Sequence, residues 1–473
     1  MQREIKNENL PYWIAVALIV LLGIFSMVTY KERMLFVDPA WVVYNIINSK
    51  SFLFAEHRYG AFITQIFPLI GSYFGLSLKT ILLFYSVSFY LFYLSAALII
   101  GSVFKQKWLS ILLALYLTLF VSDVYYWPNN EVHQGITWMF LFLGFYLYKG
   151  KKKTIFNFII AILLAVLAIC SHLLVAIPFL FLWIYLHASQ DFKTLIKNKS
   201  FLFFTILLLV LIGIRYQLSD AGWYDPVKLQ GVKEISFNGI LQAFQSGQAK
   251  SFSSLLFSNY WLSILVLGFS CGLLISSKKH LKLIALLLFT VGYFVLISIT
   301  FPDAFDRSLR FYMESEWVAL SIIISTPLAI WSMKNRKAFV ILLIIFGIRL
   351  LYIFNSYDYF HQRFENLETV THSLQQSGIN KAIIIEHQEK SEELFIMDWG
   401  LPIESLLLSK MEGSDIQTTF KVVHEPILIP QNTDSFHAAF KLQSIESLND
   451  KYFILDNTQN YKVIKGVDNL LEN

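Results

Sequence analysis

The sequence predicts a polytopic α-helical membrane protein that ends in a small soluble α/β domain. Of its 473 residues, 56% are hydrophobic and 15% are charged, whereas soluble globular proteins carry about 25% charged residues. Apolar runs close to the ~20 residues needed to cross the bilayer core recur up to residue 354. Beyond that point the chain turns polar and the apolar runs become short. The net charge of +5 is modest, and we expect no nucleic-acid partner.

The apolar runs predict about 11 membrane spans, some of them short. The first run lacks a small-residue cleavage site and is too long for a signal-peptide core, so we read it as a retained span. We place the spans at 12–30, 80–103, 108–122, 136–148, 154–170, 172–188, 201–217, 260–277, 281–300, 317–332 and 338–354.

Basic residues set the predicted orientation, because cytoplasmic loops of membrane proteins are enriched in lysine and arginine. The proposed spans place every basic cluster and the N-terminus on the inner side and the C-terminus outside. Counting the apolar segment 61–76 as a further span would break that agreement, so we predict that it lies in the outer interface. The basic clusters are Lys105 and Lys107, Lys149 with Lys151–Lys153, Lys193, Lys197 and Lys199, Lys278, Lys279 and Lys282, and Lys334, Arg336 and Lys337.

Two domains follow from this pattern, a transmembrane domain over 1–354 and a soluble outer domain over 355–473. The second domain has one segment of helical spacing, 401–411, with Pro402 in its first turn and Gly413 after its end. Strands that alternate with a helix indicate a small α/β fold. Its predicted strands lie in the short apolar runs 382–386, 394–399, 420–424 and 451–456.

Asp38 lies just after the first span, in the stretch FVDPAW at 36–41. The Asp-Pro pair predicts a helix start with Asp38 as the N-cap and Pro39 at the first helical position. Apolar and aromatic side chains follow at helical spacing, which predicts an amphipathic helix on the membrane surface. A helix cap alone accounts for Asp38, so a catalytic role depends on its surroundings.

A compact polar cluster, Glu56, His57 and Arg58, separates the two predicted interfacial helices. An interfacial salt bridge, with the arginine extended towards lipid headgroups, explains it. The alternative is that His57 or Arg58 faces a phosphate. Two more ionisable residues, His172 and Arg215, lie near outer ends of spans and are candidates on that ground, although Arg215 is also placed to reach the interface.

The second outer loop, SDVYYWPNNEVHQG at 122–135, combines an aromatic run with many polar side chains. Aromatic faces pack on sugar C–H groups, and amides or carboxylates bind sugar hydroxyls. Aromatic side chains are equally typical of the membrane interface. Glu131 and His133 are two candidate metal ligands, which is too few to define a site. The candidate sugar- or acceptor-binding residues are Glu56, Asp123, Asn129, Asn130, Glu131 and His133.

The outer stretch 301–317 contains Arg307 and Arg310, which a helix would place on one face. Paired guanidinium groups suit a phosphate or pyrophosphate, because each planar fork binds two oxygens. The alternative is a loop whose charges neutralise one another. The acidic residues of this stretch are Asp303, Asp306, Glu314 and Glu316.

These features resemble the GT-C superfamily of membrane glycosyltransferases, which use polyprenyl-phosphate-linked sugars. The resemblance depends on Asp38 after the first span, on two interfacial helices at about 39–50 and 59–76, and on the FGLSLKT turn at 74–80 before the second span. A multi-span helical domain followed by an outer α/β domain is also typical of bacterial members.

The resemblance implies that Asp38 is the catalytic base, or orients the acceptor, and that the 123–135 loop contacts sugar or acceptor. The donor phosphate would then bind Arg307, Arg310, Arg58 and His57. Many members carry a paired acidic motif in the first outer loop, whereas here Asp38 stands alone and Glu56 is the next acidic residue. The identity of the base, the need for a divalent metal and the activity of the fold therefore stay open, and no other cofactor is expected.

We therefore expect a bacterial inner-membrane enzyme that transfers a sugar from a polyprenyl-phosphate donor to a glycan, lipid or protein acceptor. Its site and C-terminal domain would face outward, because no cytoplasmic loop is large enough to bind a nucleotide sugar. The alternatives are a transporter or flippase of lipid-linked sugars and a non-enzymatic envelope scaffold. Transporters commonly show internal repeats and charged groups at mid-bilayer, and neither is visible in this sequence.

Overall fold

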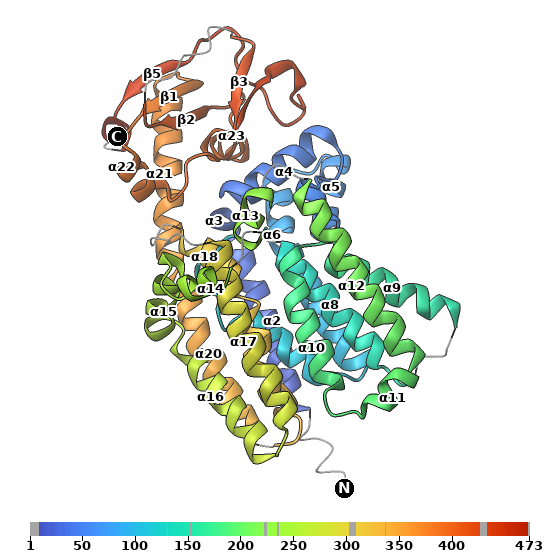
Figure 1. Cartoon of the computed structure of the whole chain (residues 1–473). Coiled ribbons are helices and arrows are strands. Elements are labelled where there is room, and N and C mark those ends of the chain that lie inside the picture. Colours follow the sequence, from blue (N-terminus) through green and yellow to red (C-terminus); the bar gives the residue numbers. More distant parts are fainter. Residues whose placement is uncertain are drawn as a thin grey trace.

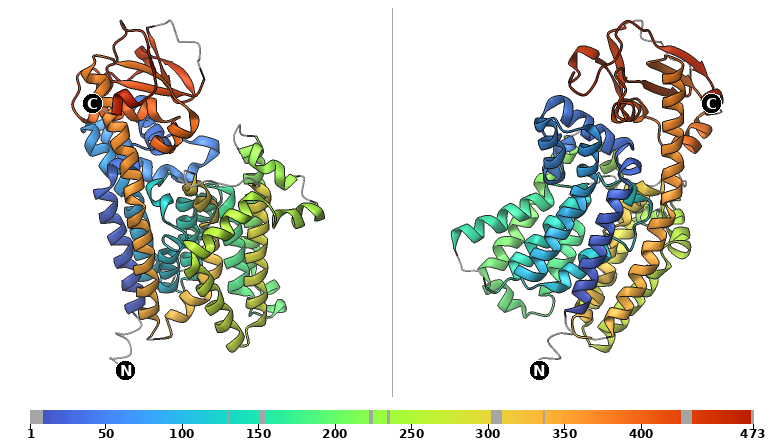
Figure 2. Two further views of the ribbon diagram at one scale, coloured as in Figure 1. Left: turned by 90° about the vertical axis from the view of Figure 1, so that its left-hand side faces the viewer. Right: turned by 180° about the vertical axis from the view of Figure 1, so that it is seen from behind.

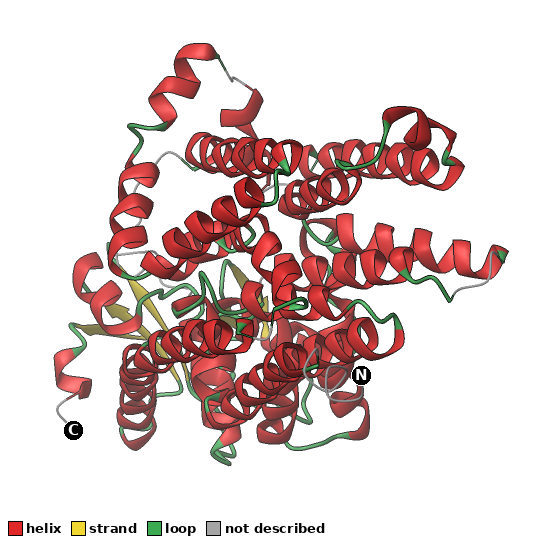
Figure 3. Ribbon diagram, turned by 90° about the horizontal axis from the view of Figure 1, so that it is seen from below, coloured by secondary structure: helices red, strands yellow, loops and turns green. Residues whose placement is uncertain are grey.

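The computed structural model describes residues 9–129, 131–150, 154–221, 225–233, 236–301, 309–335, 337–425 and 433–471. The protein is mostly helical, with a small α/β region at the C-terminal end of the chain (Figure 1). Long helices run roughly side by side, and the α/β region lies at one end of them (Figure 2). Seen from below, the strands lie behind the helices, so this region covers the far end of the helical part (Figure 3).

The first half of the chain supplies long apolar helices and two short amphipathic ones, joined by single helical turns. Its helices are α2 (Leu10–Val28), α3 (Tyr30–Met34), α4 (Val37–Ser49), α5 (Phe62–Phe74), α6 (Leu78–Leu98), α7 (Lys107–Tyr116), α8 (Glu131–Leu147), α9 (Ile155–Ile169), α10 (Ala176–His187), α11 (Phe192–Lys197) and α12 (Lys199–Asp220). The turns are η1 (Ala55–His57), η2 (Tyr59–Ala61), η3 (Ile99–Val103), η4 (Asp123–Tyr126) and η5 (Leu173–Val175).

The second half of the helical part begins with short helices and ends with longer ones. They are α13 (Asp225–Lys233), α14 (Phe237–Ala243), α15 (Gly247–Ser258), α16 (Trp261–Ser276), α17 (His280–Thr300), α18 (Arg310–Trp317), α19 (Leu320–Ser332) and α20 (Ala338–Asn355).

Several helices are suited to crossing a membrane. In the described part of the chain, five are long and apolar enough, or up to eight segments if each of three bent helix pairs counts as one span. The chain is thus a multi-pass helical protein, as its composition predicts. Each predicted span overlaps a helix, although some of these helices are short, such as α7 with 10 residues.

The two helices predicted at about 39–50 and 59–76 are present as α4 and α5. They pack against each other at the end of the helical part that carries the α/β region (Figure 1). α5 contains Pro68 and ends at Gly75, whose φ of 65° is the left-handed conformation that glycine adopts without strain. α4 also contacts α23 (Leu401–Met411), so the segment that contains α4 and α5 lies between the long helices and the C-terminal region.

The C-terminal region begins with α21 (Tyr357–Gln376), which continues α20 in a run of 39 residues. A three-stranded parallel sheet follows, in the order β2-β1-β5, with β1 (Lys381–Ile385) at its centre. The remaining elements are β2 (Thr419–Val423), the hairpin β3 (Ser435–Ala438) and β4 (Lys441–Ser444), η6 (Ile445–Ser447), β5 (Lys462–Lys465), α22 (Gln388–Phe395), α23 and α24 (Asp468–Leu471).

The predicted α/β character of this region is confirmed, as are the helix 401–411 and the strands near 382–386 and 420–424. Two predicted strands are wrong. Residues 394–399 contain the end of α22 and a bend, and 451–456 form a loop whose Tyr452, Phe453 and Leu455 are buried. Both runs are apolar because they face the core, and a short buried run does not reveal its backbone conformation. The buried apolar side chains of the helical part and of this region form one continuous core.

Candidate functional site

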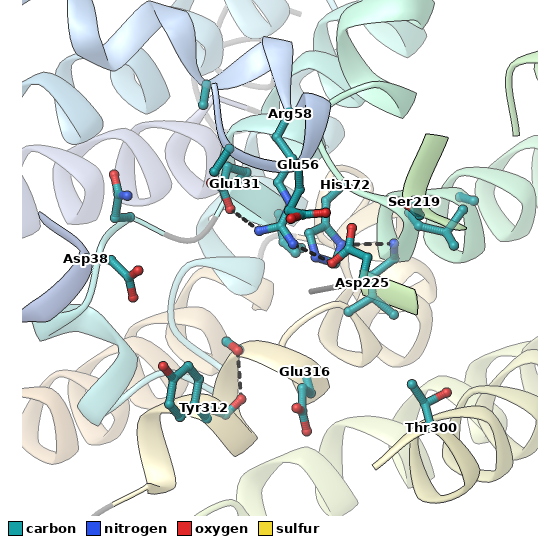
Figure 4. Close-up of a pocket in the computed structure, with 18 of the residues that line it drawn as sticks. Asp38, Glu56, Arg58, Glu131, His172, Ser219, Asp225, Thr300, Tyr312 and Glu316 are labelled. Atoms are coloured by element: carbon teal, nitrogen blue, oxygen red, sulfur yellow. Dashed lines mark hydrogen bonds and ion pairs between the residues drawn. The ribbon is translucent and has the colours of Figure 1, made fainter. Parts of the chain in front are cut away.

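A cavity of about 440 Å³ lies where the segment between α3 and α6, the ends of several long helices and the C-terminal region meet. α4, η1, α12, α13 and α18 contribute to its wall, and the C-terminal region adds Trp399 and Phe440. Figure 4 shows a group of charged side chains on one side of the cavity and Asp38 apart from them. Six residues that the sequence marks as candidates line it, namely Asp38, Glu56, Arg58, Asn129, Glu131 and His172.

Asp38 is not the N-cap that the Asp-Pro pair predicts. α4 begins at Val37, with Phe36 in the extended N-cap position, so Asp38 lies inside the first turn. Its carboxylate lines the cavity, where Oδ2 accepts a hydrogen bond of 2.8 Å from the indole Nε1 of Trp127. The Trp127 ring packs edge-on against Tyr312, 4.9 Å between centroids, which fixes the donor. The local explanation for Asp38 therefore fails, and its carboxylate faces the cavity.

Arg58 is the centre of the charged group in Figure 4. Its Nη1 bonds Glu131 at 2.9 Å and its Nη2 bonds Asp225 at 2.8 Å, while Asp225 also pairs with Arg215 at 3.3 Å. Burial alone would lower the pKa of Arg58, but the two carboxylates raise it above its ordinary value, so the guanidinium stays charged. Two arginines and two carboxylates thus hold three separate chain segments together.

The backbone beside Arg58 is strained. Glu56 has φ 49° and His57 has φ 56°, and such left-handed conformations are uncommon for residues other than glycine. Arg215, which is fully buried, donates from Nη1 to the backbone oxygen of Glu56 at 3.1 Å and helps to hold this turn. Strain of this kind persists only where the surroundings enforce it, and it gathers at functional sites.

Three buried polar atoms of the cavity-lining residues have no hydrogen-bond partner among the described residues. They are Glu56 Oε2, Arg58 Nε and Ser219 Oγ, and all three residues line the cavity. Buried polar groups in proteins are nearly always paired. The set comprises an acceptor, a donor and a hydroxyl, so the cavity wall on this side is polar just beneath its surface.

Other predicted site residues lie elsewhere. Asp123 and Arg310 form a buried ion pair with each other, His133 bonds the Tyr116 hydroxyl at 2.8 Å, and His57 is exposed beside Tyr59. None of the four is among the cavity-lining residues. Arg310 and Asp123 are thus not brought together with Asp38, and the geometry gives them a structural role. Two candidates, Asn130 and Arg307, lie outside the described residues.

Sequence reasoning missed several residues of the cavity. Asp225 carries a signal that could have identified it, because it starts α13 with the same Asp-Pro pair that follows the first span. Arg215, a candidate from its position near the end of a span, does not line the cavity but is fully buried beside it and pairs with Asp225. Trp399 and Phe440, stacked 4.7 Å apart, come from the C-terminal region and carry no local signal.

No group of three or more histidine, cysteine or acidic side chains is placed to hold a metal ion in the part of the chain that the structure describes. The arrangement therefore offers a carboxylate, arginine–carboxylate pairs and aromatic rings as its chemical groups. Comparisons with protein families, with characterised proteins and with solved structures found no match.

Proposed function

We propose that this protein is a membrane glycosyltransferase of the GT-C type, which transfers a sugar from a polyprenyl-phosphate donor to an acceptor on the outer face of a bacterial inner membrane. One observation carries the proposal. Asp38 is held by Trp127 in a cavity bordered by the amphipathic helix α4, where a lipid-linked donor and a water-soluble acceptor can meet. The resemblance of the first outer loop to that superfamily supports the same conclusion.

The proposed topology has about 11 spans, with the N-terminus inside and the C-terminal domain outside. In support of it, the basic segment at α11 and the lysine-containing turn between α16 and α17 lie at the end of the molecule opposite the α/β region (Figure 1). Because basic residues are retained on the inner side, the proposed topology has the opposite end of the molecule, with the cavity, at the outer surface.

In the proposed reaction Asp38 accepts the proton of the acceptor hydroxyl or amide. The deprotonated atom forms a bond to the anomeric carbon of the sugar, the bond from that carbon to the phosphate oxygen breaks, and the polyprenyl phosphate leaves with the electron pair. A positioned general base contributes about 10²- to 10⁴-fold to such a step. The indole of Trp127 orients the carboxylate throughout.

The sugar is assigned to the charged group around Arg58. Sugar hydroxyls both donate and accept, so they suit the polar wall that Glu56, Arg58 and Ser219 form. Both terminal nitrogens of Arg58 already bind carboxylates, which leaves this guanidinium less suited to a phosphate than the sequence suggests. The role of Arg307 in binding the phosphate stays a prediction.

The test is sugar transfer by the purified full-length protein in proteoliposomes made from bacterial lipid extract, which supplies lipid acceptors, with glycan and peptide acceptors added in parallel. The probe is a panel of polyprenyl-phosphate hexoses and pentoses labelled in the sugar. We expect Asp38→Asn to reduce transfer about 100-fold or more. The matched control is Asp358→Asn, an exposed residue of α21 away from the cavity.

The same assay separates the proposal from its two alternatives. A flippase would move the donor across the bilayer without converting it, and a scaffold would neither move nor consume it. Equal transfer by Asp38→Asn and by the unaltered protein would overturn the assignment of the base.

A further inference from the structure

The turn that presents Asp38 is held by residues that follow it by more than 300 positions in the chain. Glu404 of α23 is fully buried, and its Oε1 accepts a hydrogen bond of 2.7 Å from the backbone nitrogen of Val37. Its other oxygen pairs with Arg363 of α21, whose Nη1 donates to the backbone oxygen of Leu35 at 2.6 Å. The ion pair of Glu404 and Arg363 thus binds the turn before Asp38 at two backbone atoms, the nitrogen of Val37 and the oxygen of Leu35.

Val37 needs such support, because its φ of 28° is unfavourable for a β-branched residue. Its N–H stands at the start of α4, where no intrahelical acceptor exists, and the Glu404 carboxylate satisfies it. The approach is also close in space. A Cβ built on Gly400 would lie 2.9 Å from the Cα of Val37, so only glycine allows α23 to come so near.

We infer that Glu404 is a positioning residue for Asp38, so that the C-terminal α/β domain is a working part of the transferase site. The inference rests on the proposed function. Asp38 directly follows Val37, and its carboxylate meets the Trp127 indole at 2.8 Å. Releasing Val37 from Glu404 lets the turn relax and moves the base away from that partner.

Such a displacement affects the chemical step more than donor binding, because Glu404 is not among the cavity-lining residues. A misplacement of about 1 Å in a reacting group can cost on the order of 100-fold in rate. A loss of positioning therefore lowers kcat and leaves the KM for the donor unchanged.

The experiment compares the full-length variants Glu404→Ala and Gly400→Ala in proteoliposomes, with the labelled polyprenyl-phosphate sugar and the acceptor that the unaltered protein uses. Rates are expressed per folded molecule, from the monodisperse peak in size-exclusion chromatography. A Cβ on Gly400 would overlap Oε1 of Glu404 and lie 2.9 Å from the Cα of Val37, so Gly400→Ala disturbs the contact between these two residues sterically and tests the same geometry if Glu404→Ala does not fold. The matched control is Glu412→Ala, an exposed residue just past the other end of α23.

We expect kcat to fall about 10- to 100-fold in both variants, with a KM for the donor within about twofold of the original value and no change for the control. An unchanged kcat, or a KM that rises as kcat falls, overturns the inference. A parallel Asp38→Asn arm separates the two proposals. Loss of transfer in that arm alone overturns the role of Glu404, full activity in that arm overturns Asp38 as the base, and no transfer by the unaltered protein overturns the proposed function itself.

Discussion

Replacing Arg310 by methionine separates two roles for this residue, a ligand of the donor phosphate and a buried structural partner. Its Nε and Nη2 donate to both carboxylate oxygens of Asp123, at 2.7 and 2.5 Å. Arg310 is 8% exposed and Asp123 is 1% exposed, so water contributes little to either charge. Removing one partner of a buried ion pair costs about 3 to 5 kcal/mol, because the other charge stays buried without compensation. We expect Arg310→Met to destabilise the protein by that amount.

The measurement is the thermal unfolding midpoint of the detergent-purified full-length protein at a fixed heating rate. An unfolding entropy of about 2 cal/mol/K per residue gives about 1 kcal/mol/K for the 473 residues, so the midpoint falls by about 3 to 5 °C. Asp123→Asn leaves Arg310 unpaired and lowers the midpoint similarly. The double variant contains neither charge, and its loss is smaller than the sum of the two single losses.

The matched control is the exposed pair of Lys233 and Asp220, whose side chains are 42% and 40% exposed. Exposed ion pairs are screened by water, so Asp220→Asn should leave the midpoint unchanged. Additive losses in the double variant at Asp123 and Arg310 would refute the reasoning. An Arg310→Met protein that keeps its unfolding midpoint but loses affinity for the donor would also refute it. That result would indicate that Arg310 binds the donor phosphate.

Two further predictions follow from other charged groups. Asp225→Asn removes the carboxylate that Arg58 shares with Arg215. We expect the unfolding midpoint to fall by an amount equivalent to about 3 kcal/mol and sugar transfer to slow. Transfer at the original rate would mean that the orientation of Arg58 is unimportant. Burial, aided by a nearby lysine, lowers the pKa of His437 to about 4, below the ~6.5 of an unfolded chain. The stability from this neutral ring is present above about pH 6.5 and is lost as the pH falls towards 4. His437→Phe should therefore reduce the drop in midpoint between about pH 7 and about pH 5, and an equal drop in both proteins would contradict the assignment.

The sequence was sufficient for the features that depend on local pattern. Apolar runs of membrane length require only composition, and the helix 401–411 has the same bounds in the structure because Pro402 and Gly413 mark its ends. The pattern of the runs 394–399 and 451–456 wrongly predicts strands, because a buried loop and a buried strand have the same short apolar sequence. Their backbone is decided by contacts such as that of Tyr44 with Phe453, which no local pattern encodes.

The candidate site shows the same difference between features that a local pattern predicts and features that long-range contacts decide. Asp38 and Arg58 could be found because charged residues are conspicuous in an apolar chain, and the cavity does bring them together. The partner of each charge could not be found, since Arg310 meets a carboxylate 187 residues away. An arginine in a buried ion pair and an arginine that binds a ligand look the same in the sequence, and only the fold distinguishes them.

Four of the eight non-glycine residues with positive φ in the described part of the chain, Val37, Glu56, His57 and Ala439, lie at or next to the cavity in three separate segments, whereas Lys50, Lys105, Lys278 and Ile396 lie elsewhere. Val37 precedes Asp38, Glu56 itself lines the cavity, and Ala439, with φ 55°, precedes the lining residue Phe440. Each of these conformations costs of order 1 to 3 kcal/mol, and a chain selected for stability alone would replace them with glycine or relax them. They are held by contacts from elsewhere, such as the bonds from Glu404 to Val37 and from Arg215 to Glu56. Backbone conformations of higher energy thus occur where these segments converge. This favours a site that must hold its side chains in place over a surface that only supports a partner.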